Sequence, residues 1–177
     1  MATILAFAGS NSSSSINFKL VKYTADLIRE KKVKLKDLSG FPLPMYSDDS
    51  ENENGYPDEV VGFQKDIKEA EGLIISVNEH NGAPSAYFKN LMDWLSRVDK
   101  RFLEDKKIFL MSTSPGKRGA ISSLTYVKDT LPRFGGEIMN TFSLPSFNDN
   151  FADEKGILDA ALKKAHQETL EGFLKTL

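Results

Sequence analysis

Short apolar runs alternate along the chain with amphipathic segments, a pattern that predicts strands alternating with helices. The first run, residues 3–8, has the length of a strand and stops at Gly9, which is typical of a buried parallel strand. Residues 18–30 then carry apolar side chains at helical spacing. Further strands are predicted at 33–38, 72–77, 107–111 and 138–142. Further helices are predicted at 57–70, with Val61 on the buried side, and at 85–98, 121–134 and 154–174.

This alternation predicts an α/β fold with a parallel sheet and helices on both of its faces. No internal repeat and no linker divides the sequence, so residues 1–177 are predicted to form a single domain. Residues 39–57 interrupt the pattern with a polar loop that contains three prolines, and loops of that length are usually functional or mobile. Ligands of such folds bind at the carboxyl ends of the strands. The loops after the first, third and fourth strands are therefore the candidate sites.

Composition narrows the function classes. The formal net charge of −2 argues against a nucleic-acid-binding protein. The absence of cysteine excludes disulfides, thiol nucleophiles and cysteine metal sites. No apolar run approaches the roughly 20 residues that cross a bilayer, and the first run is too short for a signal peptide. These features predict a cytoplasmic enzyme or carrier that neither inserts into a membrane nor binds nucleic acid.

The loop after the first strand is dense in hydroxyl groups. All six residues between Gly9 and Ile16 are Ser or Asn. One of them would suffice to cap the following helix, which is the structural alternative. A helix N-terminus with unpaired backbone N–H groups attracts anions, so this loop is predicted to bind a phosphate. It is neither a Walker-type loop nor a GxGxxG fingerprint, because the required lysine and glycines are absent.

The loop after the third strand contains Asn81 and Gly82, which together with a following proline would explain a tight turn. Glu79 and His80 follow a buried strand directly and are therefore predicted at the ligand-binding edge. Gly82 also lets the backbone approach a flat ligand closely. His166, on the last helix, is expected at the surface, and the two histidines have no recognisable metal-ligand spacing.

The loop after the fourth strand, residues 112–120, is rich in glycine and contains Lys117 and Arg118. Because it faces the same edge of the sheet, we interpret it as the other wall of the pocket. Two roles remain open for the two cations, namely contact with a phosphate of a nicotinamide nucleotide or simple solvation at the surface. The sequence has no GxSxG elbow, which argues against a serine hydrolase.

Together these segments resemble the NAD(P)H-dependent FMN reductases, a flavodoxin-like group that includes bacterial azo, quinone and chromate reductases. The group's Gly-Ser-x-Arg-x-x-Ser-x-Asn is matched by Gly9, Ser10, Ser15 and Asn17, with Ser12 in place of the arginine. Its Ser-Pro-Gly-x-x-Gly-Gly is matched by residues 114–120, which end in alanine.

A further signature of the group, Pro-Glu-Tyr-Asn-Gly, is matched by residues 78–82, with Asn78 in place of proline and His80 in place of tyrosine. The associated Leu-Lys-Asn-x-x-Asp-Trp is matched by residues 88–94. Residues 37–46 also resemble the group's segment before its second helix. The similarity covers nearly the whole chain, with the motifs in the group's order.

The resemblance implies a three-layer flavodoxin-like fold with strand order 2-1-3-4-5, one non-covalently bound FMN, and a homodimer or homotetramer. It implies that the first loop holds the FMN phosphate and that the other two flank the flavin ring and ribityl chain. The cofactor-binding residues carried over in this way are Gly9, Ser10, Ser12, Ser15, Asn17, Glu79, His80, Asn81, Gly82, Ser114, Pro115 and Gly116.

The resemblance further implies hydride transfer from NAD(P)H to the bound FMN and then to a small acceptor such as a quinone, an azo compound, a flavin or a metal oxyanion. No catalytic side chain and no metal ligand is assigned, because the flavin carries the chemistry. We expect His80 to shape the surroundings of the ring. Two alternatives are a flavodoxin-type electron carrier and a flavin-free binding protein. The choice between NADH and NADPH stays open.

Overall fold

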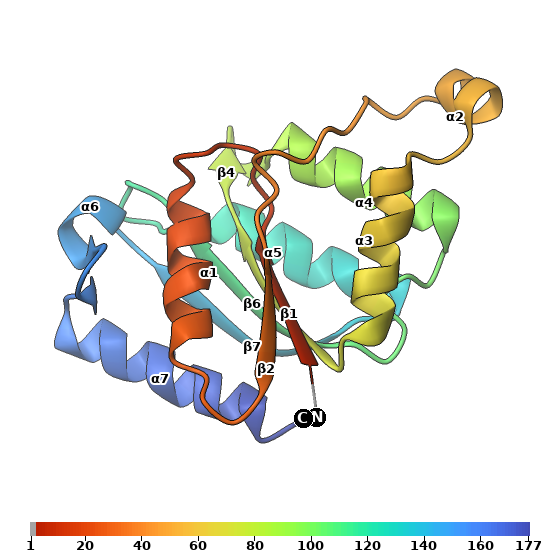
Figure 1. The fold of residues 1–177 in the computed structure, drawn as a ribbon. Coiled ribbons are helices and arrows are strands. Elements are labelled where there is room, and N and C mark those ends of the chain that lie inside the picture. The colour runs from red at the N-terminus through yellow and green to blue at the C-terminus, as the bar shows by residue number, and fades with distance from the viewer. Residues whose placement is uncertain (1–2) are drawn as a thin grey trace.

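Residues 3–177 are described by a computed structural model, in which a five-stranded parallel sheet lies between two layers of helices (Figure 1). The strands lie in the order β2-β1-β3-β6-β7. Counted along the chain these are the second, first, third, fourth and fifth strands of the sheet, so the predicted α/β class and the 2-1-3-4-5 order are confirmed. The bounds are β1 Thr3–Ala8, β2 Lys32–Lys36, β3 Gly72–Val77, β6 Lys107–Thr113 and β7 Glu137–Leu144.

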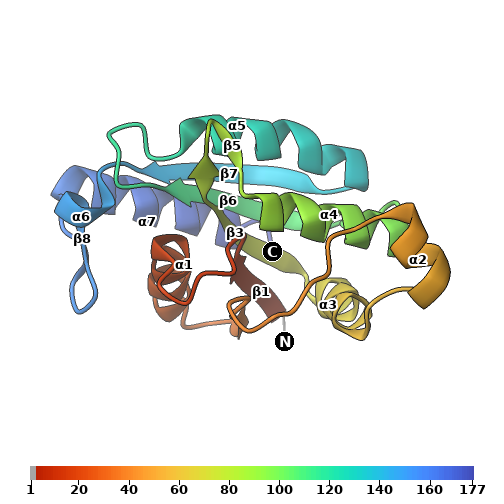
Figure 2. The same cartoon turned by 90° about the horizontal axis from the view of Figure 1, so that it is seen from above.

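Helices cover both faces of the sheet, because its strands present apolar side chains to both sides. Leu5 and Phe7 of β1 belong to one core, whereas Ile4 and Ala6 point the other way into a second core. Figure 2 shows α1 and α7 on one side of the sheet and α3 and α4 on the other. The helix bounds are α1 Ile16–Asp26, α7 Ala160–Leu174, α3 Asp58–Glu69, α4 Ala86–Val98 and α5 Ile121–Thr130, of which α5 lies on the side of α3 and α4.

Two predicted helices are shorter than expected. The first ends at Asp26, because the N–H groups of Leu27 and Ile28 bond only three residues back and tighten the last turn. The predicted helix 121–134 divides into α5 and a 3₁₀ helix, Leu131–Phe134, where Pro132 lacks a backbone donor. On α3, the expectation for Val61 was wrong, because its side chain is 44% exposed while Val60, one position away, is buried.

Two further segments were predicted with the wrong structure. The polar loop 39–57 contains helix α2, Asp48–Asn54, whose N-cap Ser47 accepts a hydrogen bond from Ser50 N. The last helix starts at Ala160, because Asp159 caps it. Before it the chain forms the short helix α6, Phe147–Asn150, and a hairpin of β8, Phe151–Ala152, and β9, Gly156–Ile157.

His166 is fully buried, which overturns its predicted surface position. Its Nε2 lies 2.9 Å from Thr24 Oγ1 on α1. The Thr24 hydroxyl donates its hydrogen to Leu20 O, so it accepts from His166 Nε2–H, and Nδ1 is left buried without a partner. The rings of Phe109 and Phe142 lie 6.0 and 5.0 Å away. This burial lowers the pKa of His166 to about 4.

We expect His166 to make the fold sensitive to acid. The pKa is depressed from 6.5 to about 4, so the stability it contributes is complete above pH 6.5 and lost as the pH falls toward 4. The loss amounts to about 3 kcal/mol of unfolding free energy. Urea unfolding at several pH values measures it. His166→Gln retains a side-chain donor for Thr24 and should flatten the acid limb. An acid limb of wild-type steepness in His166→Gln would contradict the prediction.

Candidate functional site

The loops after β1, β3 and β6 meet at the carboxyl edge of the sheet, at the top of the view in Figure 1. They enclose an open groove of about 220 Å³. The lining residues are Ser10, Ser12, Ser14, Ser15, Ile16, Asn17, Asn78, Glu79, His80, Thr113, Ser114 and Pro115. Of the predicted site residues, Gly9, Asn81, Gly82 and Gly116 belong to the same loops but are not among the lining residues. Ser14, Ile16, Asn78 and Thr113 line the groove without having been predicted.

Two serine hydroxyl groups of the loop after β1 each accept a hydrogen bond from the backbone N–H two residues later. Ser10 Oγ accepts from Ser12 N at 3.2 Å, and Ser12 Oγ accepts from Ser14 N at 3.3 Å. Ser12 and Ser14 also exchange one hydroxyl hydrogen bond at 3.2 Å. Ser15 differs, because its Oγ caps α1 by accepting from Phe18 N. An accepting hydroxyl keeps its own hydrogen, so Ser10 and the Ser12–Ser14 pair can still donate into the groove.

Gly9, at the start of this loop, is required by packing. A Cβ at this position would lie 2.6 Å from the ring of Phe88 on α4. The backbone of Gly9 also donates to Ser76 O and accepts from Ser85 Oγ. The glycine therefore lets α4 approach the end of β1.

Asn17 ties the three loops together from inside the protein. Its Oδ1 accepts from Ser76 Oγ at 2.7 Å and from Thr113 N at 3.0 Å. Its Nδ2 donates to Thr113 O at 3.1 Å. The residue is 1% exposed. One side chain thus joins α1 to the ends of β3 and β6 and fixes the relative positions of the groove walls.

The loop after β3 is a two-residue hairpin. Its strands are β4, Glu79–His80, and β5, Ala83–Pro84, which pair antiparallel. Asn81 and Gly82 connect them with φ angles of 53° and 78°, both in the left-handed region. Asn-Gly is the preferred sequence for such a turn, so the tight turn was predictable from the sequence.

Glu79 stabilises a neighbouring helix. The N-cap of α5 is Ala120, which has no capping side chain. Glu79 Oε2 accepts from Ser123 N in the first turn at 3.0 Å, and Ser123 Oγ donates to Asn78 O at 2.8 Å. The carboxylate thereby supplies the missing cap and a favourable charge for the helix dipole. No sequence pattern predicts this contact, because Glu79 and Ser123 are distant along the chain.

His80 is exposed and contacts Asn78. Asn78 Nδ2 lies 3.2 Å from His80 Nε2. The amide nitrogen can only donate, so His80 Nε2 is the acceptor of this hydrogen bond. Asn78 Oδ1 is buried without a hydrogen-bond partner. Both residues line the groove and form part of one wall.

The loop after β6 is anchored along its length. Ser114 O accepts from Phe147 N, and Gly116 O accepts from Ser146 N, each at 3.0 Å. Gly119 O accepts from Ser112 Oγ at 2.6 Å and from a second serine hydroxyl at 2.9 Å. Gly119 has a φ of 58°, and a Cβ there would lie within 3.1 Å of Leu144 backbone atoms, so only glycine fits.

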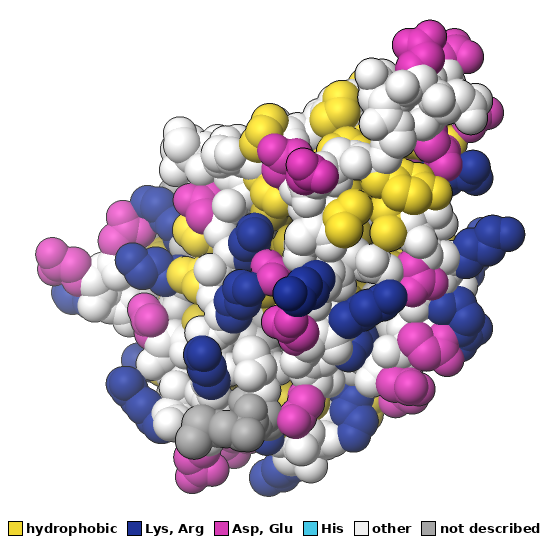
Figure 3. All heavy atoms as spheres, turned by 45° about the vertical axis from the view of Figure 1, so that its right-hand side comes forward, with side chains coloured by type: hydrophobic (Ala, Val, Ile, Leu, Met, Phe, Trp, Pro, Cys, Tyr) yellow, Lys and Arg dark blue, Asp and Glu magenta, His cyan; other side chains and the backbone are white. Residues whose placement is uncertain are grey.

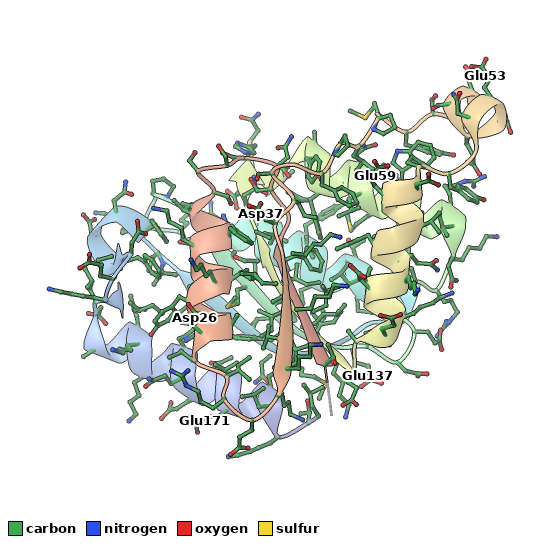
Figure 4. All side chains as sticks on the ribbon, viewed as in Figure 1. Asp26, Asp37, Glu53, Glu59, Glu137 and Glu171 are labelled. Atoms are coloured by element: carbon green, nitrogen blue, oxygen red, sulfur yellow. The ribbon has the colours of Figure 1, made fainter. Side chains whose placement is uncertain are left out.

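The α4 residues that resemble the family motif hold the segment before α2. Trp94 Nε1 and Asn90 Nδ2 both donate to Pro44 O, at 2.8 and 2.9 Å. Asn90 Oδ1 also accepts from Tyr46 N at 2.8 Å. Beyond this anchor the chain runs out to α2, whose Glu53 projects away from the body of the protein (Figure 4). The buried positions of Trp94 and Asn90 show that they position this segment.

An ion pair and hydrogen bonds connect α2 to α4 and to Tyr46. Arg97 of α4 pairs with Glu51 at 2.8 Å. Tyr46 donates its hydroxyl hydrogen to Asp48 at 2.5 Å and lies 3.0 Å from Glu51. Donation to the Asp48 carboxylate raises the pKa of Tyr46 above its ordinary value. The pairing of Glu51 with Arg97 lowers the pKa of that carboxyl.

Residues 3–177 contain neither a membrane-spanning helix nor a cluster of metal-binding side chains. No helix in this range combines the length and the apolar character needed to cross a membrane. The same residues contain no group of three or more His, Asp or Glu side chains arranged to hold a metal ion.

The sequence matches the profile of the protein family described as NADPH-dependent FMN reductase over residues 2–149. The chain belongs to this family. Proteins of similar sequence include a quinone reductase of Escherichia coli, which is 29% identical over 98 residues. That alignment covers 55% of this chain and 52% of the quinone reductase, so the match spans about half of each protein.

Other proteins align with this chain over nearly its whole length. An NAD(P)H-dependent FMN reductase of Pseudomonas aeruginosa is 25% identical over 173 residues, which cover 96% of this chain and 92% of that protein. The solved structure of FerB, a flavoenzyme NAD(P)H:(acceptor) oxidoreductase from Paracoccus denitrificans, superposes with a TM-score of 0.79 at 24% identity. It covers 99% of this chain and 96% of that one, which establishes the shared fold.

Proposed function

We propose that the protein holds one FMN in the groove and uses NAD(P)H to reduce a small acceptor, such as a quinone, an azo compound, a flavin or a metal oxyanion. The proposal rests on one observation. Three loops that are far apart in the sequence form a single groove, in a chain that belongs to the NADPH-dependent FMN reductase family.

The donors around the groove suit a phosphate-bearing flavin. Within residues 3–177, the N–H groups of Ile16 and Asn17, which open α1, make no hydrogen bond. Together with the hydroxyls of Ser10 and Ser12 they form the kind of nest that binds an anion. The lining residues include no Lys or Arg. The proposed phosphate site therefore depends on neutral donors and the dipole of α1.

Bound FMN would supply a two-electron carrier between nicotinamide and acceptor. In the proposal, Ser10, Ser12 and Ser15 hold the phosphate with the backbone of their loop, and Asn17 positions that loop. Glu79 and His80, which line the groove, face the ring from one side, and Asn81 and Gly82 form the turn of the hairpin that carries them. Ser114, Pro115 and Gly116 form the opposite side. His80 shapes the wall and transfers no proton.

We also propose that the protein works in the cytoplasm as a homodimer or homotetramer. Large apolar side chains are exposed near α2, where Figure 3 shows hydrophobic groups gathered beside an acidic tip. They include Met45, which is 71% exposed, Tyr56, which is 43% exposed, and Val61. Exposed apolar clusters of this kind favour contact between subunits.

Anaerobic mixing of the FMN-loaded protein with NADPH or NADH tests the proposal. The visible absorption of the oxidised flavin should be lost on the time scale of one turnover. It should return when a quinone is added. A flavin that stays oxidised would indicate an electron carrier without reductase activity. A protein that takes up no FMN would indicate a flavin-free binding protein. Either result contradicts the proposed function.

A further inference from the structure

Lys117 and Arg118 stand beside the groove without ionic partners. They follow Ser114 and Pro115, which line the groove, and both side chains are exposed. Among residues 3–177 neither cation makes an ion pair with a carboxylate. Within the described part of the chain, the one side-chain hydrogen bond that these two residues make runs from Arg118 Nη2 to Ser122 Oγ at 3.2 Å.

The backbone that carries the two cations is held in place. The residue before Lys117, Gly116, accepts a hydrogen bond from the chain leading into α6, and Gly119 after Arg118 accepts two from serine hydroxyls. A rigid loop loses little conformational freedom when a ligand binds. The two charges are therefore presented at a fixed place on the rim.

The carboxylate at this end of α5 is already engaged. Glu79 accepts from Ser123 N and so compensates the positive end of the helix. Asp149 on α6, the other acidic residue of the neighbouring loop, is exposed and forms no ion pair within the described chain. An incoming anion would thus meet two cations whose charge is not neutralised by a bound carboxylate.

We propose that Lys117 and Arg118 bind phosphate groups of the nicotinamide dinucleotide and make the protein prefer NADPH to NADH. The inference rests on the proposed function, because it requires that the nicotinamide end enters the groove. The phosphates of a dinucleotide seated in this way remain outside, at the rim. The groove itself offers no Lys or Arg to them. NADPH carries one phosphate more than NADH, which adds a charge of about −1.5 to −2 at neutral pH, so cations at the rim attract NADPH more strongly.

Steady-state kinetics of the FMN-loaded protein provide the first test. Relative to wild type, Lys117→Gln/Arg118→Gln should raise KM for NADPH about tenfold and KM for NADH by less than about threefold at low ionic strength. Salt should shrink the difference between the two cosubstrates in the wild type. Lys31→Gln/Lys32→Gln removes two cations at the opposite edge of the sheet and should leave both KM values as they are.

Binding measured without turnover provides the second test. Calorimetric titration of the FMN-loaded wild type should show tighter binding of adenosine 2′,5′-bisphosphate than of 5′-AMP, and the preference should disappear in the double variant. Equal affinities in the wild type, or an unchanged NADPH preference in the variant, would overturn the inference. In both cases bleaching of the flavin by NADH would still support the proposed function. Failure to bind FMN would instead remove the proposed function itself.

Discussion

Replacement of Asn17 by alanine is expected both to destabilise the protein and to disrupt the groove. The change removes the partner of Ser76 Oγ and of both backbone groups of Thr113, which are buried. Each buried group left without a partner costs about 1–3 kcal/mol, so the free energy of unfolding should fall by at least about 3 kcal/mol. With α1 no longer tied to β3 and β6, FMN affinity should fall at least about tenfold. Urea unfolding and fluorescence titration with FMN measure the two effects.

A matched control for this change lies in the same loop. Asn11 is exposed, and within residues 3–177 its side chain makes no hydrogen bond. Asn11→Ala should therefore leave both the unfolding curve and the FMN titration close to wild type. Wild-type stability in Asn17→Ala would contradict the role assigned to Asn17 in joining the loops.

Replacement of Ser12 by arginine is expected to tighten FMN binding. Ser12 lines the groove, which has no Lys or Arg of its own. A charge-assisted hydrogen bond to phosphate contributes about 1.5–3 kcal/mol, which corresponds to a gain of about 10- to 100-fold in affinity. The gain should shrink as salt is added, because charge–charge attraction is screened. Fluorescence titration at several ionic strengths measures it.

Riboflavin and a neighbouring position serve as controls for the arginine variant. Riboflavin lacks the phosphate, so its affinity should be the same in wild type and in Ser12→Arg. Ser13→Arg adds the same charge to an exposed residue of the loop that does not line the groove. It should have a smaller effect on FMN. Equal tightening of riboflavin and FMN would show that the arginine does not act through the phosphate.

The sheet was predictable because each strand carries its own signal. β1, β3 and β6 are short apolar runs, and their parallel pairing follows from the helices between them. The helix ends were less predictable, because they depend on single caps. Asp159 starts α7, and the hairpin before it gives no periodic pattern that distinguishes it from a helix.

The position of the groove could be predicted from the sequence, but the hydrogen bonds that its side chains make could not. The meeting of the three loops follows from the topology rule for parallel sheets. The contacts of Glu79 with Ser123 and of Asn17 with Thr113 join residues that are distant in the sequence. A motif pattern shows that such residues belong together, and only the structure shows that they position the loops.

His166 illustrates the same limit in the core. Its helix reads as an amphipathic surface helix, in which a lone histidine is expected to face the solvent. Thr24 on α1 supplies the hydrogen-bond acceptor of the buried imidazole. No local pattern in the sequence reports this contact between α1 and α7.

Hydrogen exchange with and without FMN tests the central claim most directly. A single flavin bound between the loops after β1, β3 and β6 should slow amide exchange in peptides covering residues 10–17, 78–82 and 113–117. Peptides from the hairpin 151–157 and from α7 should exchange at unchanged rates. Protection confined to other segments, or no protection at saturating FMN, would contradict the account.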